Sequence, residues 1–112
     1  MEKLTEKKCV ACEGGTPPFT PAQIQEYLPQ LKSEWEIVDG IKLKKRFTFQ
    51  DFKKALAFVN KVGEIAESEG HHPDIRLFGY KNVEIELSTH AVGGLSENDF
   101  IVAAKIEQLK IL

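Results

Sequence analysis

What the sequence lacks is the first guide to its class. None of its apolar runs approaches the roughly 20 residues needed to cross a bilayer, and the start, MEKLTEKK, has no apolar signal-peptide core. Fifteen Lys and Arg stand against seventeen Asp and Glu, a net charge of −2, so no positive excess attracts nucleic acid or anionic lipid. Phosphate-binding glycine motifs and a serine nucleophile elbow are absent as well. We therefore expect a cytoplasmic protein that binds neither nucleic acid nor a membrane.

Cysteine is scarce too, with only Cys9 and Cys12, in the stretch CVACEGG. A reducing cytoplasm keeps such residues as thiols, and two cysteines supply at most half of a four-cysteine zinc site. In a thioredoxin-type redox motif, a helix follows the cysteine pair. Here glycines and prolines follow it instead, which does not fit such a motif. Two interpretations remain open: a flexible, reduced tail, or a zinc ion shared between two subunits.

The 112 residues, of which 42% are hydrophobic, suffice for one domain. Residues 14–21 are rich in glycine and proline, and we take residues 1–19 as an N-terminal extension and residues 20–112 as the domain. Thr20, with a proline after it and Gln23 three residues on, forms a capping-box signature. A short helix is therefore predicted to begin at Thr20 and to end near Pro29 or Leu31.

The central part of the sequence predicts a hairpin followed by a long helix. Asp39-Gly40 separates two β-rich runs, which is typical of a tight hairpin turn. From Asp51 the apolar spacing changes to a period of 3.6 residues and stops at Gly70. The apolar face of this helix is expected to comprise Phe52, Ala55, Leu56, Val59, Val62 and Ala66.

The last third predicts a second hairpin and a final helix. The runs DIRLF and NVEIELSTH read as strands joined by a turn at residues 79–82. Ser96 with Asp99 three residues later marks the start of a helix. The resulting order, α-β-β-α-β-β-α, predicts an α+β fold in which three helices pack on one face of a four-stranded antiparallel sheet.

Three histidines stand where predicted elements end. His71 and His72 follow the long helix, with Glu67 one helical turn upstream, and His90 ends the last strand. A single histidine is most often a surface or core residue, but three groups that titrate near neutral pH at element ends are typical of a catalytic site.

The histidines could serve one of two chemistries. Three histidines can hold a catalytic zinc ion, but Pro73 favours an extended conformation at His72, and adjacent extended residues point to opposite sides. Acid–base catalysis without metal fits this pattern better, because two imidazoles can face one small molecule while one gives a proton and the other takes one. No cofactor is expected.

These motifs, taken together, resemble the pterin-4a-carbinolamine dehydratase family, also called 4a-hydroxytetrahydrobiopterin dehydratases. The likeness lies in Glu67-x-x-x-His71-His72-Pro73, then Ser88-Thr89-His90, then Gly94-Leu95-Ser96-x-x-Asp99, and covers about residues 20–112. The family fold, three helices on one face of a four-stranded sheet, agrees with the order above. The CVACEGG stretch lies outside the family core and resembles an extension of some bacterial members.

The resemblance implies a reaction and roles for the residues. A tetrahydropterin with a hydroxyl group on C4a, produced by aromatic amino-acid hydroxylases, loses water to give the quinonoid dihydropterin. His71 and His90 are then expected to be the acid–base pair, and His72 to bind and orient the ring. The residues expected to hold an imidazole, bind substrate or shape the pocket are Glu67, Pro73, Ser88, Thr89 and Asp99.

The resemblance also leaves other roles open and predicts an assembly. Some animal members are dimerisation partners of a homeodomain transcription factor, and a dehydratase that serves molybdopterin metabolism is a further alternative for a bacterial member. Family members form dimers or dimers of dimers. Open sheet edges are a liability unless paired, so we expect two copies joined edge to edge.

Overall fold

The structure, a computed structural model, describes residues 3–10 and 16–109. In this described part of the chain, three α-helices, four strands and three short 3₁₀ helices follow one another. In chain order they are η1 (Leu4–Glu6), α1 (Pro21–Tyr27), η2 (Leu28–Gln30), β1 (Glu36–Val38), β2 (Lys42–Thr48), α2 (Phe52–Glu69), β3 (Asp74–Phe78), β4 (Asn82–Leu87), η3 (His90–Val92) and α3 (Glu97–Glu107). Within these residues no helix is long and apolar enough to span a membrane.

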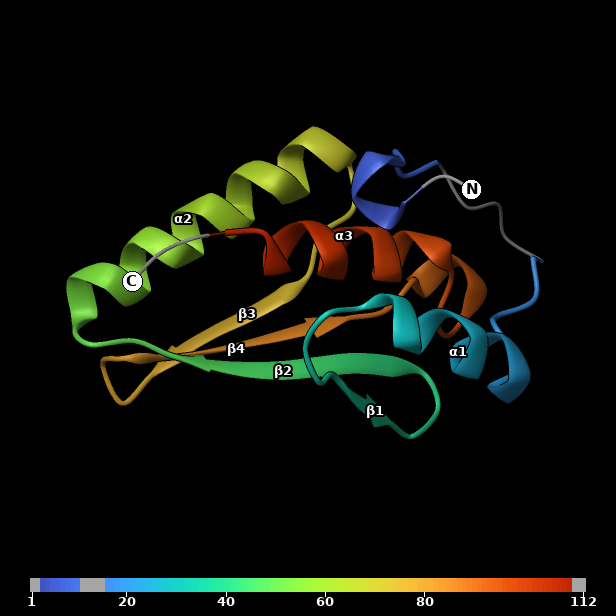
Figure 1. Cartoon of the computed structure of the whole chain (residues 1–112), viewed down its shortest axis with the longest axis horizontal. Helices are drawn as coiled ribbons and strands as arrows, with labels where there is room; N and C mark the ends of the chain where they lie inside the picture. The colour runs from blue at the N-terminus through green and yellow to red at the C-terminus, as the bar shows by residue number, and fades with distance from the viewer. Residues whose placement is uncertain (1–2, 11–15, 110–112) are drawn as a thin grey trace.

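The four strands form one antiparallel sheet in the order β1-β2-β4-β3. Figure 1 shows α1, α2 and α3 on the same side of this sheet, with α3 between α2 and α1. The predicted fold class and element order are confirmed. β4 lies in the middle of the sheet, beneath α2 and α3. The residues that follow β4 therefore lie close to those that follow α2.

Local signals explain how the elements begin and turn. The Thr20 side chain accepts a hydrogen bond from the Gln23 amide, and the Gln23 side chain accepts one from Thr20, so the predicted capping box is formed. Asp39 and Gly40 both have positive φ, 54° and 72°, the conformation that favours Asp-Gly in a hairpin turn.

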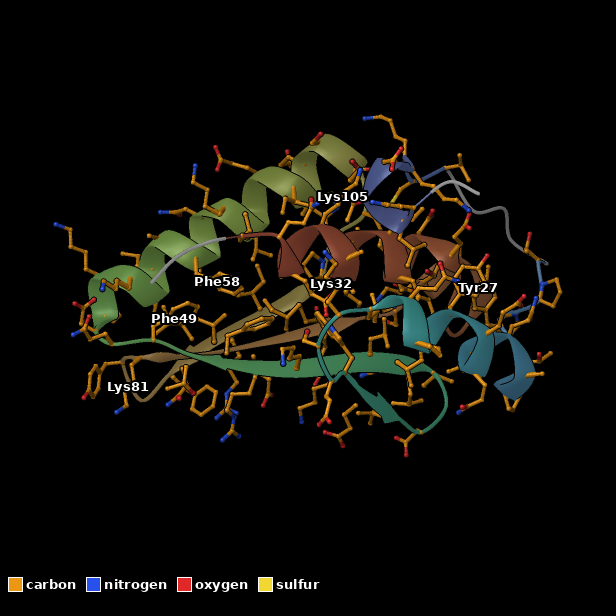
Figure 2. The ribbon with its side chains drawn as sticks, in the orientation of Figure 1. Tyr27, Lys32, Phe49, Phe58, Lys81 and Lys105 are labelled. Atoms are coloured by element: carbon orange, nitrogen blue, oxygen red, sulfur yellow. The ribbon has the colours of Figure 1, made fainter. Side chains whose placement is uncertain are left out.

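The apolar face of α2 differs from the prediction. Its buried residues are Ala55, Phe58, Val62 and Ala66, whereas Phe52 and Leu56 are 49% and 44% exposed. The cause is Phe58, whose ring lies 4.7 Å from that of Phe47 and 4.9 Å from that of Phe49. Figure 2 shows Phe49 and Phe58 between α2 and the sheet. This aromatic cluster turns the side of the helix that carries Phe58 toward the sheet.

Between its polar ends, helix α3 carries a nearly unbroken apolar run. Phe100, Ile101, Val102, Ala103, Ala104 and Ile106 are all buried. A helix that is apolar all round needs cover on all sides. The sheet, α1 and α2 cover part of α3, and the N-terminal segment, defined here as residues 3–10, lies along the remaining side (Figure 1).

The N-terminal segment is therefore not the flexible tail of the first interpretation. Leu4 is 4% exposed and belongs to the main core. Lys7 Nζ lies 2.7 Å from Glu97 Oε2 on the first turn of α3, and the Tyr27 hydroxyl donates to the same Glu97 oxygen at 2.9 Å. Cys12, the other half of the predicted pair, lies outside the described residues.

The contact between Lys7 and Glu97 predicts how stability depends on pH. The hydrogen bond from Lys7 lowers the pKa of Glu97 below its ordinary value of 4.5, against the opposing effect of burial. A lowered folded-state pKa stabilises the fold above the ordinary value, and this stabilisation is lost as pH falls through the folded-state pKa. We expect thermal unfolding scans to show the advantage of wild type over Glu97→Gln shrinking below about pH 4.5.

A matched control for this effect is Glu64→Gln. Glu64 is exposed, and its ion pair among the described residues is with Lys61, one turn away on the same helix, so its removal should cost little at any pH. If Glu97→Gln and Glu64→Gln followed the same pH dependence, the contact between Lys7 and Glu97 would not contribute to stability.

Candidate active site

The three histidines border one open hollow of about 300 Å³. Gly70 ends α2 in the left-handed conformation, with φ 65°, and directs the chain into His71 and His72. His90 begins η3 immediately beyond β4. Ser88 and Thr89 line the hollow between these two groups. Five predicted site residues, from two segments that are distant in sequence, are thus brought to one place.

His71 is held by a buried carboxylate. Its Nε2 lies 2.7 Å from Asp99 Oδ1, and its side chain is only 12% exposed. A carboxylate in its ionised form can only accept hydrogen bonds, and against that form of Asp99 the proton of this contact lies on Nε2. His71 Nδ1 is then the ring nitrogen that can take a proton from another molecule.

Asp99 is fully buried and fixed by its own neighbours. Its Oδ2 accepts hydrogen bonds from Thr89 Oγ1 at 2.8 Å and from the Ser96 backbone amide at 3.0 Å. With an exposure of 0%, Asp99 lies behind the hollow and contributes none of its lining. Its position in the first turn of α3 therefore orients His71 from behind.

His72 pairs with a different carboxylate. Its Nε2 lies 2.5 Å from Glu67 Oε2, and the two side chains are 61% and 79% exposed. Glu67 was expected to hold an imidazole, and in the structure that imidazole belongs to His72 rather than to His71. Because both groups are in water, this contact orients His72 weakly compared with the buried pair behind His71.

His90 is exposed, and within the described residues its ring has no hydrogen-bond partner. The turn that carries it is nevertheless well tied: Thr89 N donates to Gly94 O at 2.7 Å, and Gly93 N donates to His90 O at 3.1 Å. The site thus combines one oriented imidazole with one whose ring nitrogens are both open to a ligand.

The lining of the hollow differs in part from the predicted site. Residues that line it without having been predicted are Val10, Gly70, Ala91 and Asn98, whereas the predicted Glu67, Pro73 and Asp99 do not line it. Asn98 directly precedes Asp99 in α3, so its proximity follows from the motif. No sequence signal points to Val10, which reaches the site only because the N-terminal segment packs along α3.

Cys9 lies beside the site in a surrounding that keeps its thiol protonated. Burial and the nearby Glu69 carboxylate raise the pKa of Cys9 to about 12. A thiol must lose its proton to become a nucleophile or a metal ligand. Among the residues that the structure describes, no group of three or more His, Cys, Asp or Glu side chains is placed to hold a metal ion.

Comparison with known proteins adds the family to this geometry. The family model described as "Pterin 4 alpha carbinolamine dehydratase" matches residues 17–109. The chain belongs to the pterin-4-alpha-carbinolamine dehydratase family. It is accordingly an enzyme of the hydro-lyase class, which removes water from its substrate, and the resemblance seen in the sequence is confirmed.

Relatives of this dehydratase family align over nearly the whole chain. A protein of Rubrobacter xylanophilus, provisionally named pterin-4-alpha-carbinolamine dehydratase, is 47% identical over 97% of this chain and 100% of its own length. A protein of Alkaliphilus metalliredigens with the same provisional name is 45% identical over 96% of both chains. These alignments extend beyond residues 17–109, so the relatives share most of the N-terminal extension.

Two solved structures have the dehydratase fold. The crystal structure of a "transcriptional coactivator/pterin dehydratase" from Brucella melitensis has a TM-score of 0.73 and 32% identity, and the match covers 80% of this chain and 95% of that one. A "pterin dehydratase-like protein" described as a RuBisCO assembly factor in the alpha-carboxysome has a TM-score of 0.57 and 27% identity over 68% and 88% of the two chains. The role described for this second protein is thus one in assembly.

Proposed function

We propose that the chain dehydrates 4a-hydroxytetrahydropterins to quinonoid dihydropterins by histidine acid–base catalysis. The observation that carries this proposal is the placement of His71 and His90 on one hollow, His71 oriented by the buried Asp99 and His90 open to a ligand. The hydroxylated pterin is the product of aromatic amino-acid hydroxylases, and the dehydration allows the pterin to be recycled in the cytoplasm.

The chemistry requires two proton transfers. The C4a hydroxyl group takes a proton from one imidazole and leaves as water when the C4a–O bond breaks. The proton on N5 goes to the other imidazole, and the electron pair it leaves behind forms the N5=C4a double bond. No electrons are gained or lost overall, so acid–base groups on both sides of the ring are sufficient. His72 binds and orients the ring, with Glu67 behind it.

The direct test is an assay of the purified chain with 4a-hydroxytetrahydropterin generated in place by a pterin-dependent hydroxylase. We expect the absorbance of the hydroxylated pterin to decay much faster with the protein than without it, and equally fast in the presence of a strong chelator. A folded protein that leaves the uncatalysed rate unchanged would overturn the proposal. A loss of activity with chelator, restored by zinc, would overturn the acid–base mechanism.

A role as a binding partner in transcription is the alternative that one structural neighbour favours, because the Brucella melitensis protein is described as a coactivator and a dehydratase together. Binding of a partner protein needs no proton transfer. The substitution His71→Ala separates the two roles, since it should abolish dehydration and leave a purely binding function intact. A dehydratase acting in molybdopterin metabolism would differ in the pterin that it prefers.

We also propose that the chain assembles as a dimer or a dimer of dimers. β1 and β3 are the open edges of the sheet, and exposed edges tend to pair with another chain. The apolar side chains of Ile75 on β3 and of Phe52 and Leu56 on α2 are partly exposed as well. Sedimentation at micromolar concentration should give a multiple of the 12.6 kDa chain mass; a monomer would contradict this prediction.

A further inference from the structure

The first turn of α3 holds two parts of the site at once. Asp99 orients His71. Asn98, the residue before Asp99, is 5% exposed and hydrogen-bonds to the backbone of Val10. Asn98 Nδ2 donates to Val10 O at 2.6 Å, and Val10 N donates to Asn98 Oδ1 at 3.1 Å. Both backbone groups of one residue are thus bound by a single buried side-chain amide, as a neighbouring strand would bind them.

The residue before Val10 is held as firmly. Cys9 N donates to Glu69 Oε1 at 2.9 Å, and the other oxygen of Glu69 accepts from Lys105 Nζ at 2.5 Å. Figure 2 shows Lys105 reaching from α3 toward the end of α2. The Glu69 side chain is 6% exposed, so this contact too is shielded from water. Two consecutive residues of the N-terminal segment are therefore fixed to both helices that carry the site.

The side chain of Val10, in contrast to its backbone, is left 72% exposed at the hollow that His71, His72 and His90 border. A single exposed valine is ordinary on a protein surface. This one differs because buried polar groups hold its backbone in place beside the catalytic histidines. When a flat ring covers an apolar surface that is already fixed at such a hollow, it removes that surface from water, and this burial makes the free energy of binding more favourable.

We infer that Val10 is a substrate-contacting residue, an apolar wall for the bicyclic ring of the pterin, and that Asn98 is the positioning residue that holds this wall. The inference rests on the proposed dehydratase function and adds a binding contact from outside the region of the family motifs. A wall of this kind acts equally on bound substrate and on the transition state. It should therefore affect KM and leave kcat nearly unchanged.

The test compares two substitutions of nearly equal shape. Val10→Thr keeps the branched shape but replaces a methyl group with a hydroxyl, and Val10→Ile keeps the apolar character. We expect Val10→Thr to raise KM severalfold and Val10→Asp to raise it at least tenfold, with kcat within about twofold of wild type, while Val10→Ile stays close to wild type. Binding of a stable dihydropterin, followed by fluorescence, should weaken in the same order.

Asn98 is tested by its coupling to Val10. Asn98→Asp keeps the acceptor for the Val10 amide and loses the donor to its carbonyl, and Asn98→Ala loses both. Each should raise KM as Val10→Thr does, and adding Val10→Thr to Asn98→Ala should raise it little further, because the wall is already displaced. Unfolding temperatures of the Val10 variants should equal that of wild type. If the side chain had a merely structural role, its replacement would instead lower the unfolding temperature.

The outcomes separate this inference from the proposed function. If wild type dehydrates the pterin but Val10→Thr, Val10→Asp and Asn98→Asp all keep its KM and its affinity for dihydropterin, the inference is overturned and the function stands. If wild type has no activity, the proposed function fails and the inference fails with it. A fall in kcat without a change in KM would also overturn the inference, since it would place the segment in the chemistry rather than in binding.

Discussion

Replacing His71 or His90 with alanine is expected to lower kcat by on the order of 10²- to 10⁴-fold, the usual contribution of a positioned acid or base. The pterin should bind to both variants with an affinity closer to that of wild type, because the binding role proposed for His72 does not depend on either side chain. Steady-state kinetics with the enzymatically generated substrate give kcat and KM separately, and a stable dihydropterin reports binding.

The double substitution sharpens this prediction. If His71 and His90 give and take protons in the same step, removing both should cost little more than removing the more important one, since residues that act as a unit are strongly non-additive. His72→Ala is the internal control and should raise KM more than it lowers kcat. Losses of only a few fold in both single variants would contradict the acid–base assignment.

Asp99→Asn is expected to lower kcat by a similar factor, on the order of 10²- to 10⁴-fold, while the fold is retained. The amide has the size of the carboxylate and can still accept from the Ser96 amide and Thr89. Toward His71 Nε2, however, an amide nitrogen donates, which moves the imidazole proton to Nδ1. The nitrogen that should take a proton from the substrate is then already occupied. In serine-protease triads the corresponding change costs about 10⁴-fold for this reason.

Glu67→Gln makes the same chemical change in the other pair of a histidine with a carboxylate. Because His72 and Glu67 are mostly exposed, water replaces the lost contact and we expect less than a tenfold effect. Thermal unfolding separates catalysis from stability: Asp99→Asn should unfold close to wild type. Asp99→Ala should be destabilised by about 1–3 kcal/mol, because it removes the fully buried carboxylate that accepts from Thr89 Oγ1 and contacts His71 Nε2. A wild-type kcat for Asp99→Asn would show that His71 needs no orienting group.

The features that could be predicted from sequence are those set by neighbours along the chain. The capping box at Thr20, the Asp39-Gly40 turn and the stop at Gly70 each depend on a few adjacent residues, and each occurs as expected. The same holds for the gathering of His71, His72 and His90, because all three stand at the ends of elements whose order fixes where they meet. The family motif Gly94-Leu95-Ser96-x-x-Asp99 also identified Asp99 as a candidate site residue.

The features that could not be predicted depend on packing between distant segments. Periodicity alone places Leu56 in the core, but the aromatic cluster around Phe58 rotates α2 so that Leu56 faces outward. Likewise, nothing in the composition of residues 3–10 shows that they cover α3, because the uncovered side of a helix is visible only once its other neighbours are known. The contact of Asn98 with Val10, 88 residues earlier in the chain, belongs to the same class.

The contact of Asn98 with Val10 and the ion pair between Lys7 and Glu97, 90 residues apart, determine when during synthesis the fold can be completed. The N-terminal segment binds to a helix that lies 90 residues further along the chain, so these contacts cannot form until α3 has been synthesised. Contacts between segments so far apart in sequence also raise the contact order and slow folding. The side of the hollow that Val10 lines is therefore completed only once α3 is present, and a chain that ends before α3 would lack it.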